Sequence, residues 1–350
     1  MRSEHRSTLV RPPERSTPGS ATAVAQPNIA LIKYWGKRDE ALVLPWSDSL
    51  SMTLDIFPTT TRVRLAPEAE HDVVTLDGVP ARGEALRRVV AFLELVRDTA
   101  GHSARSMVDT ENTVPTGAGL ASSASGFAAL AVAAAAAYEL DLDVTALSRL
   151  ARRGSGSASR SIFGGFAMWH AGRSTGTAEE ADLSSYAEPV PMGALDPALV
   201  VVVADAGPKA VSSRAAMRRT VDTSPLYAPW AASSRDDLVD MRGALRRGDL
   251  DMVGEIAERN ALGMHATMLA ARPAVRYMSP ATISVLDSVL RLRRDGMSAY
   301  ATIDAGPNVK VLCHRADADR VAAIVRRAAP GGSVHIAGPG QGARLLADGG

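Results

Sequence analysis

Residues Pro115–Gly126 read PTGAGLASSASG and lead directly into an alanine-rich stretch that ends near Tyr138. Glycine and serine dominate the first part, and small side chains that favour helix dominate the second. A glycine-rich loop that enters a helix N-terminus directs free backbone N–H groups and the positive end of the helix dipole at one place. The segment therefore predicts an anion site, and above all a phosphate site.

Two other phosphate-loop signatures are missing from the chain. No Gly-Lys-Ser/Thr follows this loop at the Walker A spacing, and no GxGxxG of the dinucleotide-binding kind occurs. A structural helix capped by serine and glycine would have the same composition. The loop alone therefore leaves a purely structural role open.

The length and composition predict two domains with a cleft between them. The chain has 350 residues, of which 46% are hydrophobic and 22% charged, so it can bury a large core. We expect a disordered tail over residues 1–20, an N-terminal domain over 21–190 that contains the glycine-rich loop, and a C-terminal domain over 191–345. The polar stretch 172–191 is the expected linker, and the apolar run Leu199–Val203 is expected to begin the second domain as a buried strand.

Composition also excludes several classes of function. The net charge of +1 is too small for a nucleic-acid-binding surface, and no apolar run is long enough to span a membrane. The single cysteine, Cys313, excludes a disulfide framework, favours a reducing cytoplasm and is interpreted as a core residue. The histidines show no HxH or HxxxH spacing, so a metal held by the protein is not expected.

Lysine is scarce in this chain, which has 35 arginines but only four lysines. Where a generic surface cation suffices, arginine has replaced lysine, and lysine remains mainly where a compact, flexible charge is needed. Three of the four lie in segments that carry other polar signals: Lys33, Lys37 and Lys209. We interpret these three as site residues.

The hydrophobic pattern predicts an α+β chain. In the N-terminal half we expect strands over 21–32, 50–55, 106–110 and 165–170, a hairpin formed by 61–65 and 73–76, and helices over 81–99 and 144–153. In the C-terminal half we expect helices over 213–220, 234–247, 249–268 and 280–295, followed by a hairpin-like unit over 299–313.

Four further segments combine charge with turn residues. They are NIALIKYWGKRD at Asn28–Asp39, GSGSASRSIFGG at Gly154–Gly165, DAGPKAVSSRAAM at Asp205–Met217 and IDAGPNVKV at Ile303–Val311. Arg160 can bind a carboxylate with two parallel hydrogen bonds. Asp304 ends a predicted strand before a Gly-Pro turn, which would hold its carboxylate rigidly at the sheet rim. Each segment alone has a structural interpretation, as a solvated basic strand end, a flexible loop or a turn-capping aspartate.

Together these segments resemble the diphosphomevalonate decarboxylase family of the GHMP kinase superfamily. The loop PTGAGLASS is similar to the ATP-phosphate loop of the superfamily, and IKYWGK is similar to that one branch. The resemblance covers the chain from about Ala21 to Val325, with its motifs in order. It implies a GHMP kinase fold, with an N-terminal lobe like ribosomal protein S5 domain 2 and a ferredoxin-like C-terminal lobe.

The resemblance also implies an activity, namely ATP-dependent conversion of mevalonate 5-diphosphate to isopentenyl diphosphate with release of phosphate and carbon dioxide. Asp304 would be the general base, Arg160 would hold the substrate carboxylate and Lys33 would support the charge balance. The implied substrate-binding residues are Tyr34, Lys37, Ser155, Ser157, Arg160, Lys209, Ser213 and Arg214. The implied ATP-binding residues are Pro115, Gly117, Ala118, Gly119, Leu120, Ala121, Ser122, Ser123 and Ser212.

Magnesium would arrive on the phosphate oxygens of ATP, and we expect a cytoplasmic homodimer with no nucleic-acid or membrane partner. A 3-kinase of mevalonate, or a decarboxylase of another mevalonate phosphate, remains an alternative that shares the loop and the fold. One segment departs from the family pattern: LPWSDSLS has Trp46 and Ser47 where the family usually has an asparagine. Contacts to the nucleotide base are the feature that this departure puts in doubt.

Overall fold

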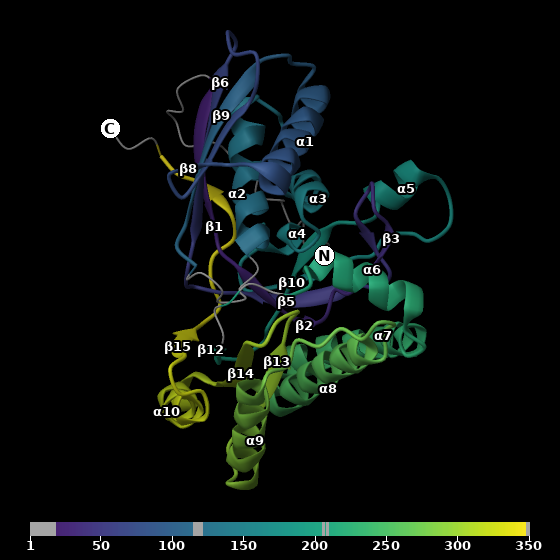
Figure 1. Cartoon of the computed structure of the whole chain (residues 1–350), viewed down its shortest axis with the longest axis vertical. Helices are drawn as coiled ribbons and strands as arrows, with labels where there is room; N and C mark the ends of the chain where they lie inside the picture. The colour runs from purple at the N-terminus through teal and green to yellow at the C-terminus, as the bar shows by residue number, and fades with distance from the viewer. Residues whose placement is uncertain (1–18, 115–121, 205–206, 208–209, 348–350) are drawn as a thin grey trace, which may run out of the picture.

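The computed structural model describes residues 19–114, 122–204, 207 and 210–347. Figure 1 shows an upper part built on one large sheet with helices along one side, and a lower part in which long helices lie beneath a second and a third sheet. Among the described residues, no helix is both long and apolar enough to cross a membrane.

The upper sheet has six strands in the order β16-β1-β6-β9-β7-β8, and every neighbouring pair is antiparallel except β7 and β9. The C-terminal strand thus returns to pair with the first strand of the chain (Figure 1). The strands are β1 (Ser20–Ala25), β6 (Thr59–Ala66), β7 (Val73–Leu76), β8 (Val79–Pro80), β9 (Arg105–Asn112) and β16 (Arg344–Leu345).

Helix α2 (Ser122–Ala137) is the centre of the upper part, because it packs on β1 and β6 and is surrounded by α1, α3 and α4. Its alanines are buried except for Ala136, which is partly buried, and their small side chains let neighbouring backbones approach closely. The neighbouring helices are α1 (Gly83–Ala100), α3 (Val144–Gly154) and α4 (Ala158–Ser161).

The second sheet is the upper layer of the lower part and has the order β11-β10-β5-β2 (Figure 1). Its apolar side chains share one core with strand β12 and helices α7 and α8, so residues from both halves of the sequence are buried together. The strands are β2 (Asn28–Ile32), β5 (Ser49–Thr53), β10 (Phe166–Trp169) and β11 (Ala187–Val190). A small hairpin, β3 (Lys37–Asp39) and β4 (Leu44–Pro45), extends from β2.

The third sheet has the antiparallel order β13-β14-β12-β15, and α10 joins its last two strands in sequence. This order of a βαββαβ chain is the ferredoxin-like arrangement that the resemblance implied. The elements are β12 (Pro197–Val203), β13 (Ala299–Ile303), β14 (Val309–His314), η1 (Arg315–Asp317), α10 (Ala318–Ala328) and β15 (Ser333–Ala337). The remaining helices are α5 (Ala178–Leu183), α6 (Ser213–Thr223), α7 (Tyr227–Arg247), α8 (Leu250–Leu269) and α9 (Pro280–Arg294).

The α+β class and most predicted elements are confirmed. The helices expected over 81–99, 144–153, 249–268 and 280–295 correspond to α1, α3, α8 and α9 within a few residues, and the hairpin over 299–313 is β13 and β14. Two helices extend beyond the prediction, since α6 ends at Thr223 and α7 begins at Tyr227. The elements after residue 314, including α10 and β15, were not predicted.

The predicted hairpin of residues 61–65 and 73–76 is wrong. Strand β9 lies between β6 and β7, antiparallel to the first and parallel to the second. The reason is the buried carboxylate of Asp72, which accepts hydrogen bonds from the Ser106 backbone N–H and from Arg97, both at 2.9 Å. These contacts fix the start of β7 beside β9, and alternation of side chains does not reveal them.

Residues 172–191 are also more regular than the irregular linker that we expected. Thr177 and Glu180 form a capping box that begins α5, and β11 pairs with β10. A division of the chain near residue 190 therefore remains a proposal. Of the predicted tail, only Gly19 and Ser20 belong to the described residues, and Ser20 opens β1.

The contact of α8 with β13 predicts an effect of one small substitution. A Cβ atom at Gly254 would lie 2.1 Å from Cδ2 of the buried Tyr300, so Gly254→Ala must shift the helix or the strand. We expect it to lower the free energy of unfolding by about 1–3 kcal/mol, as overpacking usually does.

Gly243→Ala on α7 is the control, because its Cβ would meet only the flexible end of the Arg247 side chain, at 3.3 Å. It should be neutral or stabilise by up to about 1 kcal/mol. Urea unfolding of both variants measures the difference, and equal effects would contradict tight packing at Gly254.

Candidate active site

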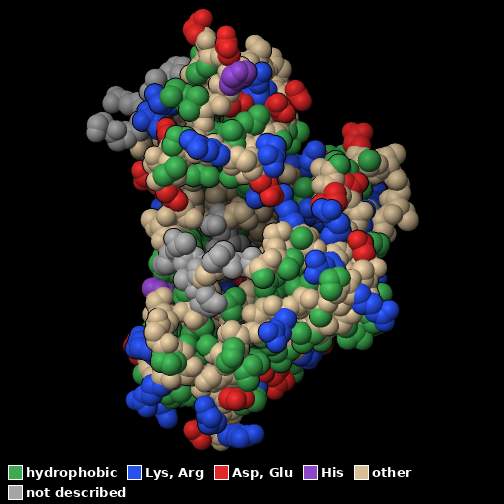
Figure 2. Space-filling model, viewed as in Figure 1, with side chains coloured by type: hydrophobic (Ala, Val, Ile, Leu, Met, Phe, Trp, Pro, Cys, Tyr) green, Lys and Arg blue, Asp and Glu red, His purple; other side chains and the backbone are tan. Residues whose placement is uncertain are grey.

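A cleft of about 820 Å³ lies between the upper and lower parts and is lined by residues from both. Figure 2 shows the molecule hollowed at this height, with basic side chains on the right-hand rim of the hollow. Six basic side chains line the cleft against four acidic ones, an excess of two positive charges. The basic residues are Lys33, Lys37, Arg88, Arg153, Arg160 and Arg214, and the acidic residues are Glu40, Asp77, Glu84 and Asp304.

Asp304 follows β13 and lies between two lysine side chains. Its Oδ1 atom is 2.7 Å from Nζ of Lys33, and its Oδ2 atom is 3.1 Å from Nζ of Lys310. The side chains of both lysines are almost completely buried, whereas that of Asp304 is 28% exposed. The carboxylate is therefore the most exposed part of this cluster.

The charges of this cluster determine its protonation. Burial would raise the pKa of the Asp304 carboxyl, but the ammonium groups of Lys33 and Lys310 outweigh it and hold that pKa well below its usual range. Burial lowers the pKa of Lys33, and Asp304 opposes that effect. Asp304 is thus a firmly ionised carboxylate that accepts hydrogen bonds and has little affinity for a proton at neutral pH.

Lys33 is held by contacts that cross the fold. Its backbone N–H donates to Oδ1 of Asn260 on α8 at 2.9 Å, and its ammonium donates to the carbonyl of Ala30 at 2.8 Å. The amide of Asn260 in turn donates to Ser234 and Asp237 of α7. These hydrogen bonds attach the end of β2 to the helical layer below it.

Arg160 on the short helix α4 is buried, with 2% of its surface exposed. It donates to the hydroxyl oxygens of Ser51 at 2.9 Å and Ser49 at 2.5 Å, and to Oδ1 of Asn28 at 3.2 Å. Burial lowers its pKa to about 10, while Asp304 opposes the effect, so the guanidinium stays charged at neutral pH.

The predicted serines also reach the cleft. Ser123, in the first turn of α2, and Ser155, after α3, lie with their hydroxyl oxygens 3.3 Å apart, and Ser157 lines the same wall. Ser212 caps α6 by accepting a hydrogen bond from the Ala215 backbone N–H, and Ser213 lies beside it.

Three other predicted residues that line the cleft have partners within the protein. Arg214 of α6 forms an ion pair with Glu84 of α1 at 3.3 Å, a contact that crosses the cleft. The Lys37 ammonium contacts Glu40 at 2.5 Å. Tyr34 packs edge-on against Trp169 with ring centres 4.7 Å apart, and burial raises the pKa of its hydroxyl.

Part of the predicted site lies outside the described residues. This holds for Pro115, Gly117, Ala118, Gly119, Leu120, Ala121 and Lys209, and for the side chain of Ser122, which begins α2. The roles of these residues in binding ATP or substrate remain predictions.

Sequence reasoning missed several residues of the site. Lys310 is the clearest, because the scarcity of lysine that singled out Lys33 and Lys37 applies to it equally. Arg88 of α1 donates to the carbonyl of Gly154 at 3.1 Å and lines the cleft, but in sequence it resembles any other arginine of an amphipathic helix. The partners of Arg160 and Lys33, namely Asn28, Ser49, Ser51 and Asn260, carry no sequence signal of their own.

The structure also places the segment that departs from the family pattern and the single cysteine. Trp46, in the segment that departs from the family pattern, is 45% exposed, whereas Ser47 is buried; neither lines the cleft within the described part of the chain. Cys313 is buried in the core of the third sheet, which confirms its interpretation as a core residue, and burial raises the pKa of its thiol to about 12.

Two family models match most of the chain. Residues 25–184 match the diphosphomevalonate decarboxylase-like N-terminal domain, and residues 198–337 match the mevalonate 5-diphosphate decarboxylase C-terminal domain. The chain belongs to the diphosphomevalonate decarboxylase family. The GHMP kinase fold and the resemblance found in the sequence are therefore confirmed.

Individual members of the diphosphomevalonate decarboxylase family agree along nearly the whole chain. Diphosphomevalonate decarboxylase mvd1 of Aspergillus fumigatus is 36% identical over 327 residues, which cover 87% of this chain and 80% of the relative. Phosphomevalonate decarboxylase of Haloferax volcanii is 33% identical over 302 residues, which cover 86% of this chain and 90% of the relative. The structure of MDDEF in complex with MVAPP, AMPPCP and magnesium superposes with a TM-score of 0.88 at 42% identity. The superposition covers 93% of this chain and 98% of that chain.

His265 predicts a pH dependence of stability. Its Nε2 lies 3.1 Å from the backbone carbonyl oxygen of Asp304, and burial lowers its pKa to about 4 from 6.5. Between these two values the unfolded chain binds a proton that the folded chain excludes, so stability falls as the pH falls from about 6.5 to about 4. The shift corresponds to about 3 kcal/mol lost at the acid end.

Urea unfolding between pH 4 and pH 7.5 measures this loss. His265→Gln keeps an N–H donor but does not titrate, so its stability should fall by about 3 kcal/mol less than that of the wild type over the same interval. Parallel curves for the two proteins would contradict the assignment.

Proposed function

We propose that this chain catalyses the ATP-dependent decarboxylation of mevalonate 5-diphosphate to isopentenyl diphosphate, with release of ADP, phosphate and carbon dioxide. The observation that carries the proposal is the pair formed by Asp304 and Lys33, which lies in one cleft with Arg160 and with the first turn of α2. Membership of the family and the substrates named for its members support the same reaction.

The first step transfers the γ-phosphoryl group of ATP to the tertiary hydroxyl of the acid. A bond forms between that oxygen and the γ-phosphorus, the bond to the ADP oxygen breaks, and the hydroxyl proton passes to the Asp304 carboxylate. A carboxylate with a lowered pKa is a weak base, so Asp304 mainly orients the hydroxyl and takes its proton late. A late transfer suits the loose transition state of phosphoryl transfer, in which little charge is required on the attacking oxygen.

The second step removes two groups from the phosphorylated acid. The C–O bond breaks and phosphate leaves with the bonding electrons, so the tertiary carbon becomes electron-deficient. The bond to the carboxylate carbon then breaks, and its electrons form the double bond as carbon dioxide departs. We assign Arg160 to hold the carboxylate, since its guanidinium is fixed by Ser49, Ser51 and Asn28.

Magnesium fits this site only if phosphate oxygens supply most of its ligands. No group of three or more His, Cys, Asp or Glu side chains suited to a metal occurs among the described residues. Bound on the phosphates of ATP, the ion would neutralise charge that develops during transfer. We assign Ser123 and Ser212, which line the cleft at the starts of α2 and α6, to the nucleotide phosphates.

The nearest rivals use the same fold on another acid. One is a decarboxylase of a monophosphorylated mevalonate, the activity named for the Haloferax volcanii relative, and another is a mevalonate 3-kinase. Carbon dioxide release measured with mevalonate, its 5-phosphate and its 5-diphosphate separates the three. ATP binding without consumption in the presence of every acid would instead indicate a module with no turnover.

We further propose a cytoplasmic homodimer with no nucleic-acid or membrane partner. The near-neutral net charge supports the absence of nucleic acid. Large apolar side chains on the outer faces of α7 and α9, among them Val239 and Ile283, are exposed in the single chain and favour a self-contact. Sedimentation equilibrium determines the number of chains in the assembly.

Asp304→Asn tests the role of the carboxylate. We expect turnover to fall by at least about a thousandfold while KM changes less than about threefold, because the group acts mainly in the transition state. Near-normal turnover would refute the assignment. Circular dichroism and thermal unfolding serve as controls, since the substitution leaves two buried lysines without their partner.

Lys37→Met tests the binding of the phosphate end of the substrate. A contact made equally in the ground and transition states affects binding alone, so KM for the diphosphate should rise about tenfold while kcat is maintained. A lower kcat with an unchanged KM would contradict this role. Glu40→Gln is the matched control, because it removes the protein's own partner of Lys37 and should not raise KM.

A further inference from the structure

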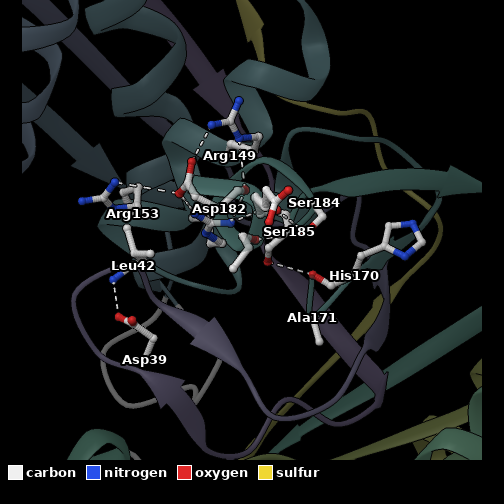
Figure 3. A network of polar contacts seen from close by, with 12 residues as sticks. Asp39, Leu42, Arg149, Arg153, His170, Ala171, Asp182, Ser184 and Ser185 are labelled. Atoms are coloured by element: carbon white, nitrogen blue, oxygen red, sulfur yellow. Dashed lines mark hydrogen bonds and ion pairs between the residues drawn. The ribbon is translucent and has the colours of Figure 1, made fainter. Parts of the chain in front are cut away.

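Three arginines of α3 meet one carboxylate beside the cleft. Asp182 of α5 accepts from Arg149 through Oδ2 and from Arg152 through Oδ1, while Nη1 of Arg153 lies 3.9 Å from Oδ1 (Figure 3). Three positive charges therefore face one negative charge. The cluster carries an excess of two positive charges at the edge of a cleft that takes anionic substrates.

The three arginines differ in how well the protein satisfies them. The side chain of Arg152 is fully buried and also donates to the backbone carbonyl of Ser185, and Arg149 donates to the carbonyl of Asp182 at 3.2 Å. Arg153 has the loosest contact with Asp182, and its side chain is 28% exposed. In Figure 3 its guanidinium lies at the outer side of the cluster, with one nitrogen joined to Asp182 by a dashed line. The donors of Arg153 are thus the ones best placed to meet an added ligand.

Arg153 reaches the same cleft as Lys37. It immediately precedes Gly154 and Ser155, and both Arg153 and Lys37 line the cleft. The β3–β4 hairpin that carries Lys37 is tied to the segment before α5, because Arg38 donates to the carbonyls of Ala171 at 3.0 Å and Arg173 at 2.7 Å. Helix α5 follows that segment and carries Asp182, so the hairpin of Lys37 is linked through it to the cluster that contains Arg153.

We propose that Arg153 is a further phosphate contact, and that it sets the preference of the site for a substrate with two linked phosphates over one with a single phosphate. The inference rests on the proposed function and deepens it. The Lys37 ammonium forms an ion pair with Glu40, which partly neutralises it, and it provides only a compact point charge. Arg153 adds a second cation with parallel donors, so that Lys37 and Arg153 together offer two positive groups. A diphosphate supplies the additional negative charge and the additional oxygens that a second cationic group would bind, whereas a single phosphate is left with fewer oxygens once Lys37 is satisfied.

The test compares two substrates in one variant. Arg153→Gln should raise KM for mevalonate 5-diphosphate about tenfold, leave kcat within about twofold and change kcat/KM for the 5-phosphate less than about twofold. The preference for the diphosphate then falls about tenfold. Arg153→Lys keeps the positive charge but loses the parallel donors of the guanidinium. It should give a KM for mevalonate 5-diphosphate between those of the wild type and Arg153→Gln.

Arg149→Gln is the matched control, because Arg149 lies on the same helix and binds the same carboxylate but does not line the cleft. It should leave both KM values unchanged. Equal losses for the two phosphorylated acids in the Arg153 variant, or no loss for either, would overturn the inference.

A second measurement does not depend on turnover. Calorimetric titration of the ATP-free protein with inorganic pyrophosphate and with inorganic phosphate should give a pyrophosphate affinity that falls about tenfold in Arg153→Gln but not in Arg149→Gln. Unchanged pyrophosphate affinity would overturn the inference even in an active enzyme. If the wild type releases carbon dioxide from neither acid, the proposed function fails, whereas the pyrophosphate comparison still decides the role of Arg153.

Discussion

The buried ion cluster of Lys33, Asp304 and Lys310 is the constraint on which the site depends. Lys33 comes from the end of β2 and Asp304 from the end of β13, 271 residues later in the chain. Because an unpaired charge in this position would be costly, the cluster is formed only when the second and third sheets are correctly placed. The position of the Asp304 carboxylate thus depends on the correct packing of the second sheet against the third.

The same cluster fits the role that we propose for Asp304. Two lysines keep the carboxylate ionised and fix its position, and such a group would orient an alcohol rather than remove its proton early. The remaining positive charge of the cleft is spread over residues from α1, α3, α4 and α6. Such a distribution matches reactants that carry negative charge at both ends, a carboxylate at one and phosphates at the other.

Much of the fold was predictable because local rules apply to it. Helix α1 shows its apolar stripe, β12 is a continuous apolar run, and the alanines of α2 indicated a helix packed on every side. The predicted hairpin before β9 was wrong because strand pairing there depends on the buried Asp72, whose partners Arg97 and Ser106 are distant in sequence. Residues 172–191 appeared irregular because polar composition hides a short capped helix and an edge strand.

By itself, the sequence determined the family and the α+β class, because these depend on motifs that are contiguous along the chain. It also predicted Lys33, Arg160 and Asp304 as site residues, and the structure places all three in one cleft. Only the tertiary structure revealed Lys310 as the second partner of Asp304, the serines and asparagine that hold Arg160, and the arginine cluster around Asp182. The physical reason is that charge compensation and hydrogen bonding act over a few ångströms in space. Residues separated by many positions acquire a shared role only when the fold brings them together.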